Sequence, residues 1–449
     1  MHIPSPPSPA DRPLYGWEKA SVALLGLLVV AFGGVTLLRS AYLTTRKTDF
    51  GVYARAAWAV RTGGDPYRTA DDNDWHYVYP PPFVLLFLPL ADPPAGADRA
   101  GYLPYPLGVV IWYAVGLLLL GYALHTFAAV CLPTAIPWSR RWWYARLLPF
   151  DLCVAALGFT LARGQANILL VAILAAAFAA AIRATPIRSG AWFAAAACLK
   201  VFPALLVLFP MVRREWRAAI GYVGGAAVLL LVLPALMWGP KGAVEQNVRF
   251  LQLVVAPGLF DAGELSAEDK LLAKELHNMT AKDSQSFVAT LHYWRYPDVA
   301  TRPDVPDADT RRWHWLLSGL TILVTVAAGE RLRRRRPTPS DWLVFLGCLI
   351  AVMLLVVPVS HFHYYAIVTP FVAGLVCRSL ANDPRRAIPD PRTLAVLIAW
   401  ALATSVPLLD FKFCETLRTS GVAPVATLAL WAFGIIVLLN RPSQQPAPR

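Results

Sequence analysis

The sequence predicts an all-helical protein that crosses a membrane many times. Of its 449 residues, 57% are hydrophobic and only 15% are charged, whereas about a quarter of the residues in a soluble domain are charged. The hydrophobic residues also occur in long uninterrupted blocks, which is the pattern of helices solvated by lipid. Together these observations exclude a single soluble globule.

Ten apolar blocks are long enough to span a bilayer. The first follows a polar, Pro-rich tail at residues 1–20 and lacks a small-residue cleavage site, so we expect a retained helix rather than a signal peptide. One transmembrane domain is therefore predicted over residues 21–440, followed by a short tail at 441–449. The predicted spans are 21–39, 107–131, 147–162, 166–183, 216–238, 313–329, 341–357, 361–378, 393–409 and 422–440.

The distribution of charge predicts the orientation. The net charge is +13, yet segment 42–106 holds 6 basic and 7 acidic residues, and segment 239–312 holds 9 basic and 11 acidic. The basic excess thus lies in short links between apolar blocks, which marks those links as cytoplasmic. We expect both termini inside, the two long segments outside, and no nucleic-acid partner. The expected location is a bacterial plasma membrane.

An eleventh apolar stretch, 190–211, breaks this charge pattern if it crosses the membrane. Basic residues flank it at Arg183 and Arg188 on one side and at Arg213, Arg214 and Arg217 on the other. Two half-helices broken at Pro203 would return both flanks to the cytoplasmic side. We therefore predict a re-entrant segment over 190–211, with Lys200 near the cytoplasmic half.

A carboxylate follows the first predicted span. Asp49 lies at the expected outer membrane face, where a carboxylate can act as a general base toward a hydroxyl nucleophile. The alternative is that Thr48 or Asp49 only caps the helix that begins there. Tyr53 in the same segment and Asp65 are further binding candidates, although Asp65 stands in a Gly-rich turn that its side chain can simply stabilise.

Two other sets of polar residues interrupt apolar surroundings. Lys200 lies in a wholly apolar stretch, and an ionisable group at membrane depth is a functional candidate; a lysine that extends toward an interface is the alternative. Arg163, Gln165 and Asn167 form a tight turn between two spans. They can bind a phosphate or a sugar, because a guanidinium offers a fork of donors, or they can cap the adjoining helices.

Histidines begin a later predicted span on the outer side. His361 and His363 are two residues apart, which does not align them on one helical face, so no metal site is predicted. One of them can donate to a phosphate leaving group, or can be satisfied by the backbone at the interface. In segment 282–287, Gln285 lies between serines, and the aromatic stretch 292–296 suits either a sugar face or a membrane-interface belt.

Several common sites are missing from the sequence. It has no Gly-rich phosphate loop, no Asp-x-Asp pair and no cytoplasmic domain for a nucleotide, so a soluble nucleotide-sugar donor is not expected. No cofactor is predicted. The cysteines have no spacing that suits zinc or a disulfide framework; they are Cys131, Cys153, Cys198, Cys348, Cys377 and Cys414.

Taken together, four blocks over residues 20–380 resemble glycosyltransferase family 87. This family comprises polyprenol-phosphate-sugar-dependent enzymes of the GT-C type and includes actinobacterial alpha-mannosyltransferases of lipoglycan assembly. The blocks are Asp49-Phe50-x-x-Tyr53 with Gly63-Gly64-Asp65-Pro66-Tyr67 and Tyr79-Pro80-Pro81; Gly164-Gln165-x-Asn167; Lys200-Val201-Phe202-Pro203 before Arg213-Arg214; and Ser284-Gln285-Ser286 with His361 and His363.

The resemblance implies a GT-C-like bundle of about ten transmembrane helices with re-entrant half-helices and two large outer loops. It implies a lipid-linked sugar phosphate as donor and a glycolipid or glycan as acceptor. It also implies Asp49 as the base in an inverting transfer of a hexose, and the expected hexose is mannose. Lys200, Arg163, His361 and His363 are the candidate phosphate ligands. A lipid or solute transporter in which Lys200 binds a charged head group is the alternative, although no internal repeat supports it.

Overall fold

The computed structural model describes residues 8–42, 48–259, 284–298, 301–409 and 411–440. Over these residues the chain forms helices and no strand, with isolated bridges only between Pro13 and Ser139 and between Ser284 and His361. The all-helical prediction is confirmed.

Within the described ranges, eight helical runs are long and apolar enough to cross a membrane. Three of them combine α-helix with a short 3-10 or π-helical continuation. The runs are α1 (Gly16–Tyr42), α4 (Tyr105–Cys131), α10 (Trp216–Ala227) continued by η3 (Val228–Val232), α11 (Leu233–Phe250) and η4 (Leu251–Val255), α15 (Ala308–Arg333), α16 (Pro339–Val356), η5 (Phe362–Val368) with α17 (Thr369–Asn382), α18 (Pro391–Ser405) with η6 (Val406–Leu408), and α20 (Val422–Leu439).

The structure departs from the ten predicted spans in two places. The predicted span 147–162 belongs to a pair, α5 (Arg140–Leu152) and α6 (Val154–Arg163), that is bent by 65° and makes at most one further crossing. The predicted span 166–183 is α7 (Asn167–Ile182), whose 16 residues rise only about 24 Å, less than the ~30 Å hydrocarbon core. The apolar residues are present as the hydropathy indicates, but some of them belong to turns at the ends of the helices and do not lengthen the helix.

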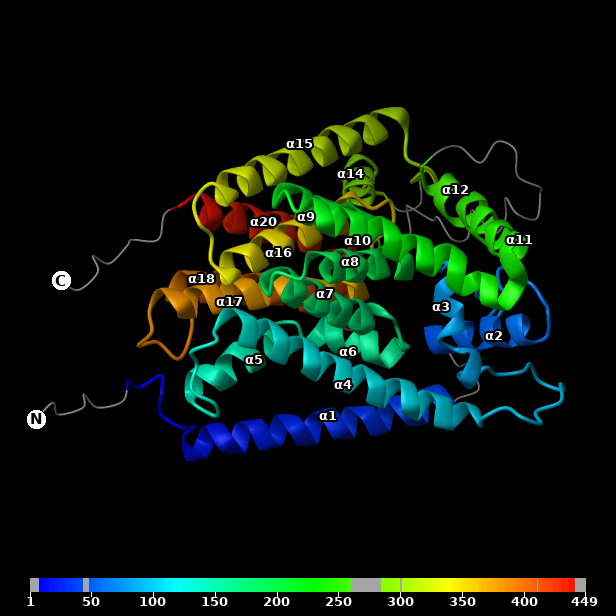
Figure 1. Ribbon diagram of the computed structural model, residues 1–449, viewed down its shortest axis with the longest axis horizontal. Helices are drawn as coiled ribbons and strands as arrows, with labels where there is room; N and C mark the ends of the chain where they lie inside the picture. The colour runs from blue at the N-terminus through cyan, green and yellow to red at the C-terminus, as the bar shows by residue number, and fades with distance from the viewer. Residues whose placement is uncertain (1–7, 43–47, 260–283, 299–300, 410, 441–449) are drawn as a thin grey trace, which may run out of the picture.

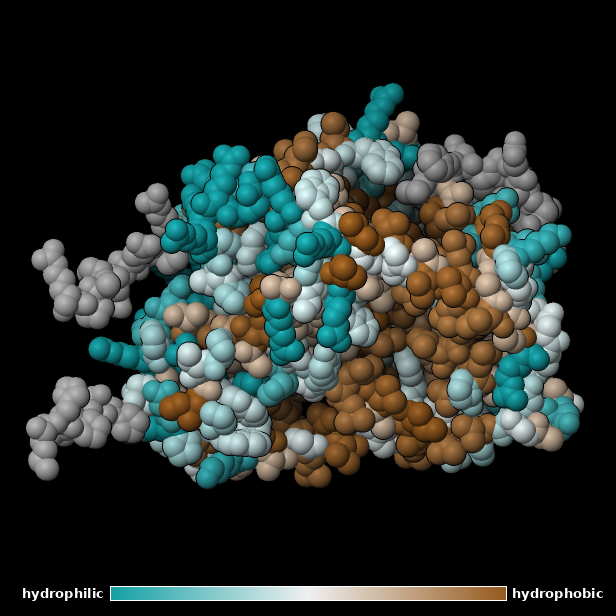
Figure 2. Space-filling view, viewed as in Figure 1, coloured by the Kyte–Doolittle hydropathy of each residue, from teal (hydrophilic) through white to brown (hydrophobic). Residues whose placement is uncertain are grey.

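The bundle has a central layer and a lipid-exposed periphery (Figure 1). Helix α16 is central, with 89% of its apolar window buried, whereas α1 lies at the edge with 6% buried. Figure 2 shows the consequence as a broad apolar surface over the middle of the molecule, with hydrophilic side chains gathered toward the end that carries both termini. Exposed leucines on α1 are therefore placed for contact with lipid rather than water.

Helix α8 (Pro186–Leu199) crosses α10 at very close range. A Cβ atom on Gly190 would lie 1.8 Å from the carbonyl oxygen of Ala218, and one on Gly221 would lie 2.2 Å from that of Ile187. Only glycine fits at these two positions, because any side chain would push the helices apart.

The chain then reverses at the end of α8. After Lys200 it returns through η2 (Phe202–Val207) and α9 (Leu208–Val212), and the Arg213 guanidinium donates to the carbonyl of Ala181 at 3.2 Å. Segment 186–212 thus starts and finishes near the last turn of α7, with Lys200 at its far tip. Which face of the membrane this end occupies stays a prediction.

The end of the bundle opposite the termini carries several short helices (Figure 1). Helices α2 (Asp49–Arg61) and α3 (Pro81–Leu85), with η1 (Leu88–Leu90), come from the first polar segment. The second polar segment begins as a helix, because the chain only kinks at Gly239 (φ 72°) before α11 continues into α12 (Ala256–Leu259). Its later part forms α14 (Phe287–Arg295), near which α19 (Lys412–Thr419) ends.

Candidate active site

Asp49 is the first residue of α2 and its carboxylate faces a cation. Its Oδ2 accepts a hydrogen bond from Arg163 Nε at 3.2 Å, and the two side chains are 18% and 29% exposed. The preceding Thr48 has the extended backbone of an N-cap but makes no capping hydrogen bond through its side chain; its hydroxyl pairs with Tyr105 instead. Helix capping alone therefore does not account for these two residues.

Arg163 is positioned by the turn that ends α6. Gly164 adopts a left-handed conformation (φ 67°), and a Cβ there would lie 2.9 Å from Cβ of Phe50 on α2. This close approach brings the turn against the helix that carries Asp49. The guanidinium also lies over the ring of Trp75, 5.2 Å from its centroid.

Lys200 lies beside the same turn. Its ammonium donates to Asn167 Oδ1 at 2.8 Å and to Gln165 Oε1 at 3.5 Å, and the side chain is buried, with the residue only 5% exposed. The ring of Tyr364 lies 4.2 Å from the ammonium and that of Tyr79 5.3 Å. The ammonium therefore does not extend to an interface.

The expected depth of Lys200 was wrong. Sequence reasoning put it near the cytoplasmic half, whereas it lies level with the 163–167 turn, which the same topology assigns to the outer side. The reason is that α8 runs back along most of α7 before the chain reverses. A half-helix of 14 residues carries its last residue about 21 Å along the bundle.

Asn167 and Gln165 connect Lys200 to other segments. The Asn167 amide nitrogen donates to the carbonyl of His363 at 2.9 Å. Gln165 Oε1 also accepts from the Tyr79 hydroxyl at 3.0 Å, and that hydroxyl accepts from Tyr53 at 2.8 Å. The amide oxygens of both residues therefore face hydrogen-bond donors within the protein.

The two histidines adjoin this cluster. Their rings stack with centroids 5.4 Å apart, and both rings contact Tyr364 edge-on. His363 is 3% exposed, and its two ring nitrogens have no hydrogen-bond partner among the described residues. Across the same residues, no group of three or more His, Cys, Asp and Glu is arranged to hold a metal ion.

Two predicted site residues have side chains bound by other parts of the chain. Gln285 donates to the carbonyl of Arg418 at 2.9 Å and helps to hold the 358–361 link. Asp65 accepts from the backbone of Tyr67 and pairs with Arg249 at 2.9 Å, which fits the turn-stabilising alternative. Residues 282 and 283 of the same predicted motif lie outside the described residues.

Sequence reasoning did not select Tyr79 and Tyr364 as site residues. Both stand in blocks that the sequence already offered, the Tyr-Pro-Pro run and the His-Tyr-Tyr run. Burial raises the pKa of Tyr79 well above its usual value, and the nearby Tyr364 and Asp49 raise it further. The pKa of Tyr53 is raised in the same way, so both hydroxyls keep their protons and remain donors.

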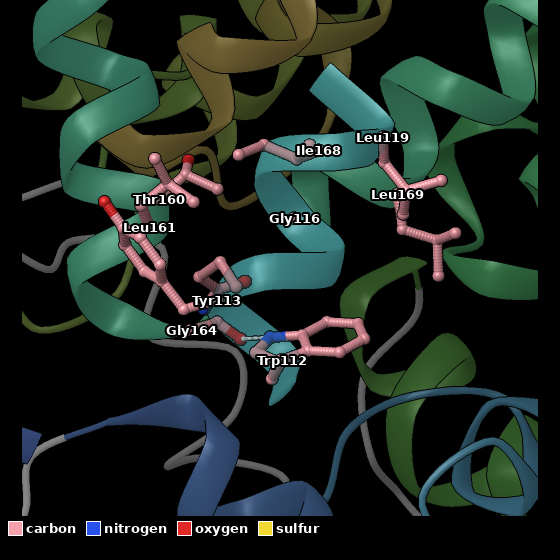
Figure 3. A pocket seen from close by; sticks show the side chains of 10 residues that line it. Trp112, Tyr113, Gly116, Leu119, Thr160, Leu161, Gly164, Ile168 and Leu169 are labelled. Carbon is pink, nitrogen blue, oxygen red and sulfur yellow. Dashed lines mark hydrogen bonds between the residues drawn. The ribbon is translucent and has the colours of Figure 1, made fainter. Parts of the chain in front are cut away.

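A small cavity borders the cluster on the side of α4 (Figure 3). Trp112 and Gly116 line it from α4, and Thr160 and Gln165 line it from α6 and the turn that follows α6. The Trp112 indole donates to the carbonyl of Gly164 at 2.8 Å. The cavity has a volume of about 20 Å³, which accommodates roughly one water molecule.

Known proteins identify the family. The sequence model of Glycosyltransferase family 87 matches residues 77–358, more than half of the chain. The chain belongs to glycosyltransferase family 87. This family 87 protein is thus a multi-pass membrane glycosyltransferase. The matched region includes Tyr79, Arg163 and Lys200, whereas Asp49 and both histidines lie beyond it.

Two crystal structures of ArnT from Cupriavidus metallidurans are similar to the family 87 chain. The apo structure is 14% identical with a TM-score of 0.41, over 94% of this chain and 77% of that one. The structure bound to undecaprenyl phosphate is 14% identical with a TM-score of 0.39, over 93% and 78%. No curated protein matches the sequence.

Proposed function

We propose that this family 87 protein is an inverting glycosyltransferase that uses a polyprenyl-phosphate sugar. It transfers a hexose to a cell-envelope glycolipid or glycan on the outer face of a bacterial membrane, and the proposed hexose is mannose. The observation that carries the proposal is the convergence of Asp49, Arg163 and Lys200, which come from three distant segments. Both termini are then cytoplasmic, as the charge distribution indicates.

Asp49 is the proposed general base. Its carboxylate is partly exposed and can take the proton of an acceptor hydroxyl, whose oxygen then attacks the anomeric carbon of the donor. The bond between that carbon and the phosphate oxygen breaks, and its electron pair leaves with the phosphate. One displacement inverts the anomeric configuration.

The leaving phosphate requires positive charge nearby. An ammonium has three N–H donors, and the described residues supply acceptors for two of those on Lys200. The third is available to a phosphate oxygen. Arg163 bonds Asp49 only through Nε, so its remaining N–H groups can reach the same anion. Donors held in place before the reaction supply the largest part of such stabilisation.

The histidines are weaker candidates for this role. The rings of His361 and His363 lie beside the cluster, and the unpartnered nitrogens of His363 are buried. A lipid-linked donor fits the surroundings, because α4 presents apolar side chains to the bilayer next to the turn of Arg163.

The experiment uses the purified full-length protein in lipid nanodiscs. It is given synthetic polyprenyl-phosphate mannose and an extract of envelope glycolipids, and product formation and release of polyprenyl phosphate are measured. We expect transfer from the lipid-linked sugar, none from a nucleotide-linked mannose, and the opposite anomeric configuration in the product by NMR.

Other results would replace the proposal. Transfer of a different hexose corrects only the choice of sugar. Retention of the anomeric configuration contradicts the single displacement, and movement of the donor between leaflets with no turnover favours a flippase.

A further inference from the structure

A chain of hydrogen bonds joins the helix of the proposed base to Lys200. Tyr53 lies four residues after Asp49 on α2, on the same face of the helix. Its hydroxyl donates to the Tyr79 hydroxyl at 2.8 Å, which donates to Gln165 Oε1 at 3.0 Å. The same oxygen accepts from the Lys200 ammonium at 3.5 Å.

The direction of this chain determines which end of the Gln165 amide faces Lys200. The Lys200 ammonium can only donate, so the Gln165 oxygen faces it, and the single proton of the Tyr79 hydroxyl is directed at the same oxygen. An oxygen rather than an amide NH₂ then faces Tyr79, and the same oxygen faces the ammonium. Without the Tyr79 hydroxyl, the ammonium is the one remaining donor of these two, so the Gln165 amide is held less firmly beside Lys200.

Burial makes the arrangement persistent. Tyr53, Tyr79, Gln165 and Lys200 are all at most 8% exposed, so water does not readily replace a missing donor. The Tyr79 ring lies 5.3 Å from the ammonium, and the raised pKa of its hydroxyl keeps the proton in place. A hydrogen bond to an enclosed amide contributes more to order than one on the surface.

We propose that Tyr79 is a positioning residue that acts through Gln165 to hold Lys200 against the donor phosphate. This inference rests on the proposed function, since it assigns Lys200 to the phosphate. Tyr79 touches neither donor nor acceptor in this role. The Tyr79 hydroxyl fixes the orientation of the Gln165 amide. The Gln165 amide in turn fixes the direction in which the remaining N–H of the Lys200 ammonium points.

The test compares Tyr79→Phe with Tyr77→Phe in the nanodisc transfer assay. Each variant loses one buried hydroxyl and keeps its ring, and the Tyr77 hydroxyl bonds the backbone at Pro80 and Val84 rather than Gln165. For Tyr79→Phe we expect kcat/KM for the donor to fall roughly tenfold, the size of one lost hydrogen bond, with KM for the acceptor unchanged. Tyr77→Phe is expected to stay within about twofold of wild type.

A second arm distinguishes positioning from a general effect on folding. In a Gln165→Ala background, Tyr79→Phe is expected to cause no further loss of kcat/KM, because two residues that act through one contact are not additive. An equal loss in both backgrounds overturns the inference, as does a Tyr79→Phe enzyme with wild-type kcat/KM. Melting temperatures of both tyrosine variants are measured alongside.

The wild-type enzyme separates this inference from the function it rests on. If wild type transfers no sugar from the lipid-linked donor, the proposed function is overturned and the inference with it. If wild type is active and Tyr79→Phe is indistinguishable from it, only the role of Tyr79 is overturned.

Discussion

Buried charges at the two ends of the bundle have different partners. At the end that carries the termini (Figure 1), Glu18 is 3% exposed and its carboxylate pairs with Arg140 at 2.8 Å and accepts from the Tyr144 hydroxyl at 2.7 Å. At the other end, the equally buried Lys200 meets two neutral amides and the rings of Tyr79, Phe202 and Tyr364.

The difference separates charges that hold the fold from a charge that can bind a ligand. Removing an ion from water is costly, and an opposite charge compensates that cost inside the protein. Glu18 is compensated in this way, and so is Asp341, which pairs with Arg378 at 2.6 Å. Amide oxygens and ring faces compensate Lys200 only in part, so an incoming phosphate gains from its charge.

The strongest test of this contrast removes the carboxylate at the candidate site. Asp49→Asn keeps the shape of the side chain but cannot take a proton, so we expect transfer to fall by about 10²–10⁴-fold, the usual contribution of a general base. The measurement is initial rate at saturating donor. Asp98→Asn, an exposed carboxylate of the same polar segment, serves as the matched control.

Full activity of Asp49→Asn would remove the assignment of the base. It would leave the phosphate site untouched, because Lys200 and Arg163 do not depend on Asp49 for their other contacts.

A somewhat smaller effect is expected from Lys200→Met. Methionine fills similar space without the charge, so we expect transfer to fall by about 10²-fold or more, as for the loss of one preorganised donor, while the melting temperature stays the same or rises. A rise is the physical signature of a buried cation that is incompletely compensated. Lys200→Arg is the companion variant, in which partial activity is expected.

If Lys200→Met instead lowers the melting temperature sharply and leaves the rate per folded molecule unchanged, Lys200 is a structural residue. The contrast between the two ends of the bundle would then disappear.

The smallest effect on activity is expected at the opposite end. Asp341→Asn leaves Arg378 without its carboxylate, and both side chains are about nine-tenths buried; it also disturbs the capping box that starts α16. Because breaking a buried pair costs about 3 kcal/mol, we expect a melting temperature lower by several degrees and a rate per folded molecule within twofold of wild type. A large loss of rate at unchanged stability would show that this end also takes part in catalysis.

Much of the fold was predictable because lipid imposes a simple rule. Hydropathy located α1, α4, α16 and α20 to within a few residues, since a backbone in hydrocarbon must satisfy its own hydrogen bonds. The rule was less accurate at α7, which has only 16 residues, and at the α5–α6 pair, which is bent by 65°. There the length of a helix is set by where turns and neighbouring helices stop it, which a count of apolar residues does not contain.

The candidate site was predictable as a set of residues but not as an arrangement. Lys200 was selected because an ionisable group at membrane depth is costly. Asp49 was selected as a carboxylate at the expected outer face, and Arg163 as a fork of donors in a tight turn. Tyr79 gave no such signal, since a tyrosine is unremarkable in an aromatic segment. Gln285 and Asp65 looked equally suitable by residue type, yet their side chains are held by other parts of the chain.

The lipid surroundings, the helical class and the charge asymmetry of this protein could all be derived from its sequence, because they follow from composition and from patterns over about twenty residues. Which charges are compensated depends on the packing of the helices. The ion pair of Asp49 spans 114 positions of the chain, and the link from Asn167 to His363 spans 196. Contacts at such separations depend on how helices pack, and helix packing is a property of the whole bundle.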